Sequence, residues 1–173
     1  NYNSDDKSIS LDLKFSDLGL QSGTKYGIYK VLSGGYQNIT QASNNFSITK
    51  SITPVTAEFF EFIKLPIYSN FNGQTTNFDT YLDIRSVQNA IIEKTGGGKI
   101  QFSQTLNFEG LDLNNGINIS SNSILIDSNK LPSLNTAATI SLYGINFKTP
   151  GILKNNSTCP ASECVFKDYK DGV

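Results

Sequence analysis

Residues 8–15 read SISLDLKF, in which small or charged side chains alternate strictly with large apolar ones. The apolar positions are Ile9, Leu11, Leu13 and Phe15. Successive side chains of a β-strand point to opposite faces, so this alternation predicts a half-buried strand. The same period of two recurs along the chain in short segments that are rich in aromatic and β-branched residues and are bounded by turn residues.

Working outward, TKYGIYKV at 24–31 predicts a second strand, and its alternation slips near Tyr29 as at a β-bulge. Residues 80–94 fit either a helix or a single turn of helix followed by a strand at 89–94. The second alternative is favoured, because three glycines at 96–98 follow at the distance of a hairpin turn. Asn114-Asn115-Gly116 predicts another hairpin. Further strands are predicted at 36–40, 45–49, 54–62, 99–103, 105–108, 111–113, 117–119, 123–127, 137–143, 145–147, 151–153 and 164–169.

These short strands, without a convincing long helix, predict an all-β protein. We expect two tandem antiparallel β-sandwich domains of the immunoglobulin-like or Greek-key type. The smaller domain spans 1–66, and the larger spans 67–173 and contains the Cys159–Cys164 loop. The boundary lies where Pro66 and a polar run break the strand pattern. A parallel β-helix is the alternative, but no fixed repeat period supports it.

The composition narrows the possible partners and the compartment. The net charge is −1 and Arg85 is the single arginine, so no basic cluster indicates nucleic-acid binding. No apolar run is long enough to span a bilayer. The chain begins with Asn1 instead of Met, which indicates a removed signal peptide or a piece of a longer protein.

Cys159 and Cys164 are the two cysteines of the chain, and four residues separate them. A metal site would need further Cys or His ligands, and the chain has no histidine. A redox pair usually has the Cys-x-x-Cys spacing. A structural disulfide in an oxidising compartment is therefore favoured over two free thiols, and closing so short a loop contributes only about 2 kcal/mol.

The chain lacks most of the residue combinations that enzymes use for catalysis. The absence of histidine excludes Ser-His-Asp and Cys-His systems. Glu58 and Glu61 are the best carboxylate pair, but three residues apart in a strand they lie on opposite faces, which favours solvated glutamates. Lys94–Lys99 lacks the spacing of a phosphate loop and fits a glycine-rich turn. We expect no enzyme, no cofactor and no metal site.

The chain has two oxygen-rich segments that could supply calcium ligands, and several tyrosines that could stack on a sugar. Neither Asp5-Asp6 nor the group Asp112, Asn114 and Asn115 matches a known calcium loop. The chain has no tryptophan, so a glycan ligand would rely on tyrosine rings. The candidate rings are Tyr36, Tyr68 and Tyr81.

Four segments carry a resemblance: TTNF at 75–78, EKTGGGKIQF at 93–102, LDLNNGINIS at 111–120 and SLNTAATISLYGINFKTPGILKN at 133–155, which leads into TCPASECVFKDYKDG. From Thr75 onward the chain resembles a β-sandwich repeat module of archaeal cell-surface proteins of the S-layer and adhesin type. The first half is similar to small accessory sandwich domains beside such modules. The resemblance implies an extracellular, structural or adhesive role and brings no catalytic residue.

The same resemblance implies one more apolar strand after DYKDG, whereas this chain stops at Val173. An incomplete sheet would offer an open edge to a strand from a neighbouring subunit. Ile9, Leu11, Leu13 and Phe15 are the candidate donor strand. The alternative is that the sequence simply ends here.

We therefore expect a non-enzymatic extracellular building block of a cell-surface layer or filament, which self-associates with strand donation as the mode of assembly. The alternative is a carbohydrate- or surface-binding adhesin module of a larger secreted protein. Five Asn-x-Ser/Thr sites would carry glycans in a surface glycoprotein, although the composition alone yields about as many by chance. These sites are Asn38, Asn45, Asn118, Asn155 and Asn156.

Overall fold

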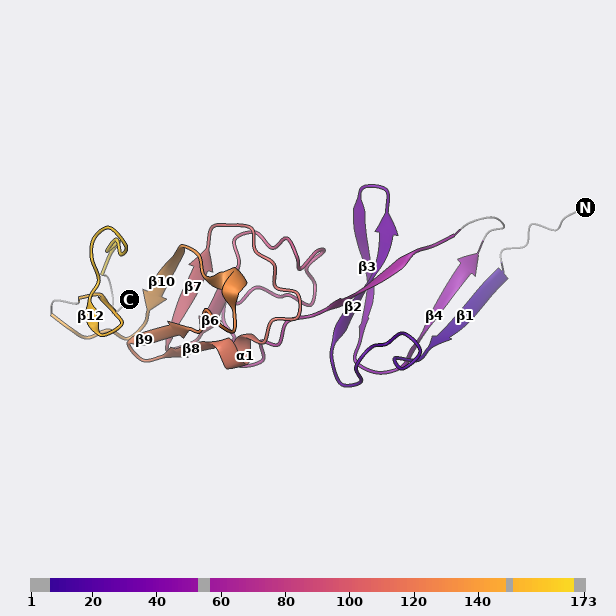
Figure 1. Ribbon diagram of the computed structural model, residues 1–173, viewed down its shortest axis with the longest axis horizontal. Coiled ribbons are helices and arrows are strands. Elements are labelled where there is room, and N and C mark those ends of the chain that lie inside the picture. Colours follow the sequence, from indigo (N-terminus) through magenta and orange to yellow (C-terminus); the bar gives the residue numbers. More distant parts are fainter. Residues whose placement is uncertain (1–6, 53–56, 149–150, 170–173) are drawn as a thin grey trace, which may run out of the picture. The chain divides into compact units, whose positions relative to one another are not determined.

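The computed structural model describes residues 7–52, 57–148 and 151–169 (Figure 1). The described chain consists of short strands in several small antiparallel sheets, with one helical turn, α1 (Leu113–Gly116), and one 3-10 turn, η1 (Pro132–Leu134). The predicted all-β class is confirmed.

The chain forms two compact units. Unit 1 comprises Asn1–Pro66, Asn77–Val87 and Asn107–Leu111, and unit 2 comprises the remaining segments, Ile67–Thr76, Gln88–Leu106 and Asp112–Val173. The chain first leaves unit 1 after Pro66, where the sequence predicts a boundary, and it returns to that unit twice. No single cut therefore separates the two units.

The described residues of unit 1 form two sheets. In the first, β2 (Tyr26–Leu32) lies between β3 (Gly35–Ala42) and β5 (Phe60–Lys64). The register of β2 against β3 shifts between Ile28 and Tyr29, which confirms the predicted bulge. In the second sheet, β1 (Lys7–Leu13) pairs with β4 (Phe46–Ile52).

The two returning segments complete the core of unit 1. Phe78 and Ile84 from 77–87 and Phe108 from 107–111 are fully buried, and the rings of Phe78 and Phe108 lie 4.6 Å apart. Their backbones also bond, because the Phe108 N–H donates to the Ile84 carbonyl at 2.9 Å. Full burial of each such side chain stabilises the fold by about 1.5–3 kcal/mol. The segments are attached to the rest of unit 1 by other contacts, since the Gly110 N–H donates to the Lys64 carbonyl at 2.9 Å and Lys25 pairs with Asp79 at 2.6 Å.

Unit 2 is built on the sheet β10–β7–β6, formed by Ala138–Leu142, Gly98–Phe102 and Ile91–Lys94. The strand predicted at 89–94 and its glycine hairpin are confirmed, since β6 pairs with β7 across Lys94 and Gly98. A second hairpin joins β8 (Ile117–Ser120) to β9 (Ser123–Ile126). A third joins β11 (Leu153–Lys154) to β12 (Ser157–Thr158).

The hairpin predicted at Asn114-Asn115-Gly116 is wrong. These residues form α1, because the Asp112 carboxylate caps the turn by accepting a hydrogen bond from the Asn115 N–H at 3.1 Å. Gly116 is required there for close packing, since a Cβ would overlap the side chain of Leu131. The hairpin lies downstream, where Asn122 adopts φ 61° between β8 and β9. Residues 105–108, 111–113, 145–147 and 164–169, also predicted as strands, do not form strands.

Candidate functional site

The structure contains the predicted disulfide between Cys159 and Cys164, with their Cα atoms 5.9 Å apart. The backbone closes the same turn, because the Cys164 N–H donates to the Pro160 carbonyl at 2.9 Å. Outside the turn, the Cys159 N–H donates to the Ile152 carbonyl at 3.0 Å. The bond therefore links a turn to the neighbouring β11–β12 hairpin.

The β11–β12 hairpin reverses direction at Asn155 and Asn156, whose φ angles are 52° and 63°. Two consecutive residues with positive φ are the requirement of a type I′ turn, and asparagine accepts that conformation better than most residues. The Asn-Asn pair is therefore the local reason why β11 and β12 pair. Lys154 adds an ion pair to Glu163 across the disulfide turn.

Residues 151–169, which we call the disulfide lobe, expose large apolar side chains. Leu153 is 66% exposed, Val165 69% and Phe166 54%. No residue of the lobe is buried. A shallow hollow of about 380 Å³ lies among Ile152, Cys159, Val165 and their neighbours. Apolar patches of this kind on a folded protein mark interaction surfaces.

The predicted donor strand is paired within its own chain. β1 pairs residue by residue with β4, with Leu13 opposite Phe46 and Leu11 opposite Ile48. This pairing corrects the expectation that Ile9–Phe15 is held free for a neighbouring subunit. Phe15 follows β1 and is a core residue, only 2% exposed.

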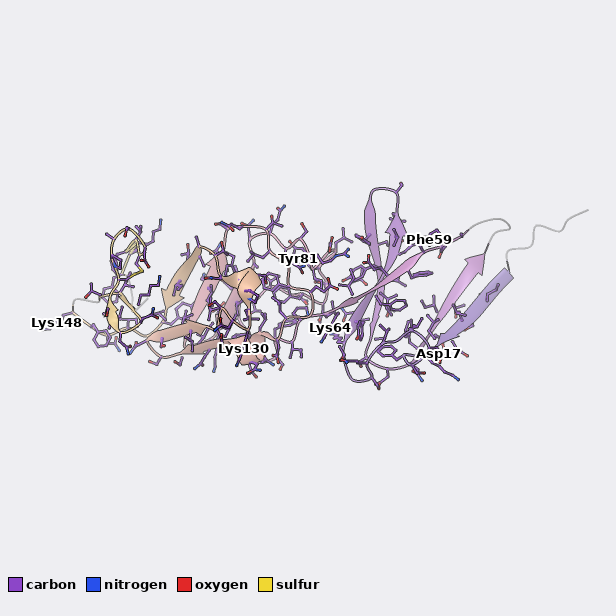
Figure 2. All side chains as sticks on the ribbon, viewed as in Figure 1. Asp17, Phe59, Lys64, Tyr81, Lys130 and Lys148 are labelled. Carbon is purple, nitrogen blue, oxygen red and sulfur yellow. A yellow bond between two sulfur atoms is a disulfide. The ribbon has the colours of Figure 1, made fainter. Side chains whose placement is uncertain are left out.

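The pairing leaves part of β1 uncovered. We call the two strands the β1–β4 ribbon (Lys7–Leu13 and Phe46–Ile52). Side chains at directly paired positions of β1 and β4 lie on the same face of the ribbon. Ile48 is buried on that face, whereas Ile9 is 48% exposed and Leu11 56% exposed. The protein therefore has two exposed apolar surfaces among its described residues, the disulfide lobe in unit 2 and this ribbon in unit 1. Figure 2 shows the described side chains of both units.

The five predicted glycosylation asparagines differ in their surroundings. Asn45, Asn118, Asn155 and Asn156 are exposed, and Asn38 is half-buried in β3. The Asn45 side-chain oxygen accepts a hydrogen bond from the Phe15 N–H at 2.9 Å, so that amide already has a structural role. The structure brings Asn155 and Asn156 together on one turn and separates the others along the chain.

A buried carboxylate that sequence reasoning missed holds the edge of the main sheet in unit 2. Glu93 on β6 is 8% exposed and accepts hydrogen bonds from the Gln74 N–H at 2.6 Å and from the Tyr143 hydroxyl at 3.2 Å. Burial and the neighbouring Glu93 carboxylate raise the pKa of Tyr143. The Glu93 backbone also accepts a bond from the Asn72 N–H at 2.9 Å. Its partners are structural, so we assign Glu93 no catalytic role.

The single arginine organises a polar cluster on unit 1. Arg85 bonds to Glu61 at 2.7 Å and to Asp83 at 3.0 Å, and its guanidinium lies 4.8 Å from the ring centre of Tyr36. Burial lowers the pKa of Arg85, but hydrogen bonds to these three partners outweigh it and raise the pKa above its usual range. Because Arg85 covers one face of Tyr36, that ring is poorly placed to stack on a sugar.

The described carboxylates that the sequence offers as catalytic or calcium-binding candidates have structural partners. Glu58 forms an ion pair with Lys30 at 2.5 Å, and Glu61 pairs with Arg85, so they serve different contacts. Asp112 caps α1, and Asp5-Asp6 lies outside the described residues. Within 7–52, 57–148 and 151–169 no three Cys, Asp or Glu side chains gather as a metal site.

No protein-family model, no curated protein and no solved structure matches this chain. None of the helices in the described part of the chain is both long and apolar enough to cross a membrane.

Proposed function

We propose that this chain is a non-enzymatic, extracellular structural protein that self-associates as the building block of a cell-surface layer or filament. The observation that carries the proposal is the clustering of exposed apolar side chains on the β1–β4 ribbon and on the disulfide lobe. Single exposed apolar residues are normal on a protein surface, but clusters usually become covered by a partner.

The disulfide supports the extracellular part of the proposal. Cys159 and Cys164 are bonded to each other, and such bonds persist in oxidising environments, whereas cytosolic thiols are kept reduced. As part of the same proposal, units 1 and 2 are β-sandwich domains of a surface glycoprotein of the archaeal S-layer and adhesin type. Donation of β1 is not included, because that strand pairs with β4.

The test is self-association of the purified, oxidised chain. Sedimentation velocity over a hundredfold concentration range should show reversible growth, and negative-stain electron microscopy of the concentrated samples should show ordered layers or filaments. A chain that stays monomeric throughout contradicts the proposal. If such a monomer also bound particular glycans on an array, the adhesin alternative would replace it.

A further inference from the structure

The disulfide lobe has little besides its covalent bond to hold it in shape. Strands β11 and β12 are two residues long each, and an ion pair between Lys154 and Glu163 crosses the disulfide turn. The Tyr169 hydroxyl donates to the Ile145 carbonyl at 2.6 Å and ties the end of the lobe to the rest of unit 2. No described residue of the lobe is buried, so burial of apolar surface, the main source of stability in folded domains, contributes little here.

Both cysteines of the lobe are reachable from solvent. Cys159 and Cys164 are each half-buried, and both line the shallow hollow beside the turn. Thiol–disulfide exchange begins when a thiolate reaches one of the two sulfur atoms, and its rate depends on access to that atom. A small thiol can therefore approach the bond while the chain stays folded.

The fold also protects the bond only weakly in thermodynamic terms. The two cysteines are five positions apart, and closing so short a loop favours the folded state by a factor of only about thirty. Because the two equilibria are linked, the folded lobe favours the bonded cysteines over two thiols by about the same factor. Disulfides that are exposed in this way are the labile ones, whereas strongly protected bonds resist reduction.

We propose that the Cys159–Cys164 bond is a redox-sensitive switch, which orders the disulfide lobe while it is closed and releases the lobe when a dithiol opens it. One thiolate of the dithiol attacks a cysteine sulfur, the S–S bond breaks, and the other cysteine leaves as a thiolate. The second thiol of the dithiol attacks the mixed disulfide and releases the first cysteine. Two electrons pass from the dithiol to the protein, the dithiol closes to a disulfide, and the cysteines take up the two protons that it loses.

The switch acts on the lobe and leaves the core of unit 2 in place. The fully buried side chains Ile92, Ile100 and Phe102 lie on β6 and β7, outside residues 151–169. Their contacts do not involve the disulfide turn, so opening the bond removes no apolar burial from that core. The switch needs no self-association, and it therefore goes beyond the proposed function.

The first experiment compares reduction of the folded full chain by dithiothreitol with reduction of the same chain in concentrated urea. Samples are quenched by rapid alkylation, and mass spectrometry counts the alkyl groups. We expect the two rates to agree within about tenfold, and the two reduction equilibria to differ by no more than about thirtyfold. Reduction of the folded chain that is slower than this would show that the fold protects the bond, and would overturn the inference.

The second experiment tests release of the lobe by limited trypsin digestion. Trypsin cleaves after lysine, and Lys154 lies in the lobe whereas Lys99 lies on β7. The chain is reduced, its thiols are alkylated, and the reductant is removed before trypsin is added. We expect cleavage after Lys154 to become about tenfold faster or more, and cleavage after Lys99 to stay slow. A reduced sample that is reoxidised with oxidised glutathione instead of alkylated should return to the original rate.

The matched control combines Cys159→Ser with Cys164→Ser, which leaves no bond to open. This variant should be cleaved after Lys154 as fast as the reduced wild-type chain, with or without prior treatment by dithiothreitol. If the reduced wild-type chain is cleaved as slowly as the oxidised one, the lobe is ordered without its bond and there is no switch. If cleavage after Lys99 accelerates as much as cleavage after Lys154, reduction unfolds unit 2 as a whole, which also overturns the inference.

Discussion

Gly73 lies directly against the carboxylate of Glu93. Gly73 has φ +60°, and a Cβ built on it would approach Glu93 Cδ to 2.6 Å. The next N–H along the chain, that of Gln74, donates to the same carboxylate at 2.6 Å. The glycine thus permits the backbone to reach a buried charge, which only a residue without a side chain allows at this position.

We expect Gly73→Ala to destabilise unit 2 by about 2–4 kcal/mol, because it combines backbone strain with overlap on a buried group. Gly96→Ala is the matched control, since Gly96 has φ +81° and no atom within 4 Å of an added Cβ. The control should lose about 1 kcal/mol from strain alone. Urea unfolding of both variants measures the difference, and equal losses would contradict the role of the Glu93 contact.

Glu93→Gln should destabilise unit 2 by about 1–3 kcal/mol. The amide replaces one acceptor oxygen with an NH2 group, so either the Gln74 N–H or the Tyr143 hydroxyl loses its acceptor in a buried site. Glu109→Gln is a control at an exposed glutamate and should change stability by less than about 0.5 kcal/mol. Chemical denaturation monitored by circular dichroism compares the two variants. Unchanged stability of Glu93→Gln would show that the stability of unit 2 does not need the carboxylate.

Stability should fall as the pH rises above about 10. Burial raises the pKa of Tyr29, as does Asp83, and burial with Glu93 raises that of Tyr143, both from an ordinary value of 10.0. The folded chain therefore keeps these protons after the unfolded chain has lost them. The contribution is complete below pH 10.0 and is lost as the pH rises through the folded pKa values.

Denaturation series between pH 8 and about 11 measure this slope. Tyr143→Phe should make the decline of unit 2 stability shallower than in the wild-type chain. An identical alkaline slope in wild type and Tyr143→Phe would show that this hydroxyl does not contribute.

Removal of the disulfide should loosen the lobe and leave the cores intact. Cys159→Ser combined with Cys164→Ser deletes a bond worth about 2 kcal/mol, but no residue of 151–169 is buried. We expect faster proteolysis within the lobe and almost the same midpoint of thermal unfolding. Alkylation without reductant supplies the direct check on the wild-type chain, since uptake of two alkyl groups would show that the bond is absent.

Asn45, Asn118, Asn155 and Asn156 are all exposed, but if the chain matures as a surface glycoprotein, glycans should lie on Asn118, Asn155 or Asn156 and not on Asn45. A glycan attaches to Nδ2, whereas the Asn45 Oδ1 accepts a hydrogen bond from the Phe15 N–H at 2.9 Å. Turning that side chain outward for modification would leave a backbone donor without its partner. Peptide mapping of native material shows which of these asparagines carry glycans. A glycan found on Asn45 alone would contradict the structural argument.

Local features were predictable where a few neighbouring residues decide the backbone. The alternation of Ile9, Leu11 and Leu13 specifies a strand, and the slip at Tyr29 marks a bulge. The glycines at 96–98 permit a tight hairpin. The two cysteines had no other thiol to pair with. Such features depend on side-chain period and turn chemistry, which act over a few residues.

The misassigned turn shows where local rules fail. Asn115-Gly116 is a strong hairpin signal by itself, but the Asp112 cap and the close approach of Leu131 to Gly116 favour a helical turn. Leu131 is fifteen positions away in sequence, a separation across which periodicity carries no information. A distant packing partner can therefore outweigh a local preference of about 1 kcal/mol.

The sequence by itself determined the all-β class, most strand positions and the disulfide, because period, turn residues and the cysteine count act locally. Tertiary structure alone decided that 77–87 and 107–111 return to unit 1, that Glu93 is buried beside Gly73, and that β1 pairs with β4 while leaving Ile9 and Leu11 exposed. Those outcomes depend on which distant segments bury the most apolar surface together, and that choice is made over the whole chain.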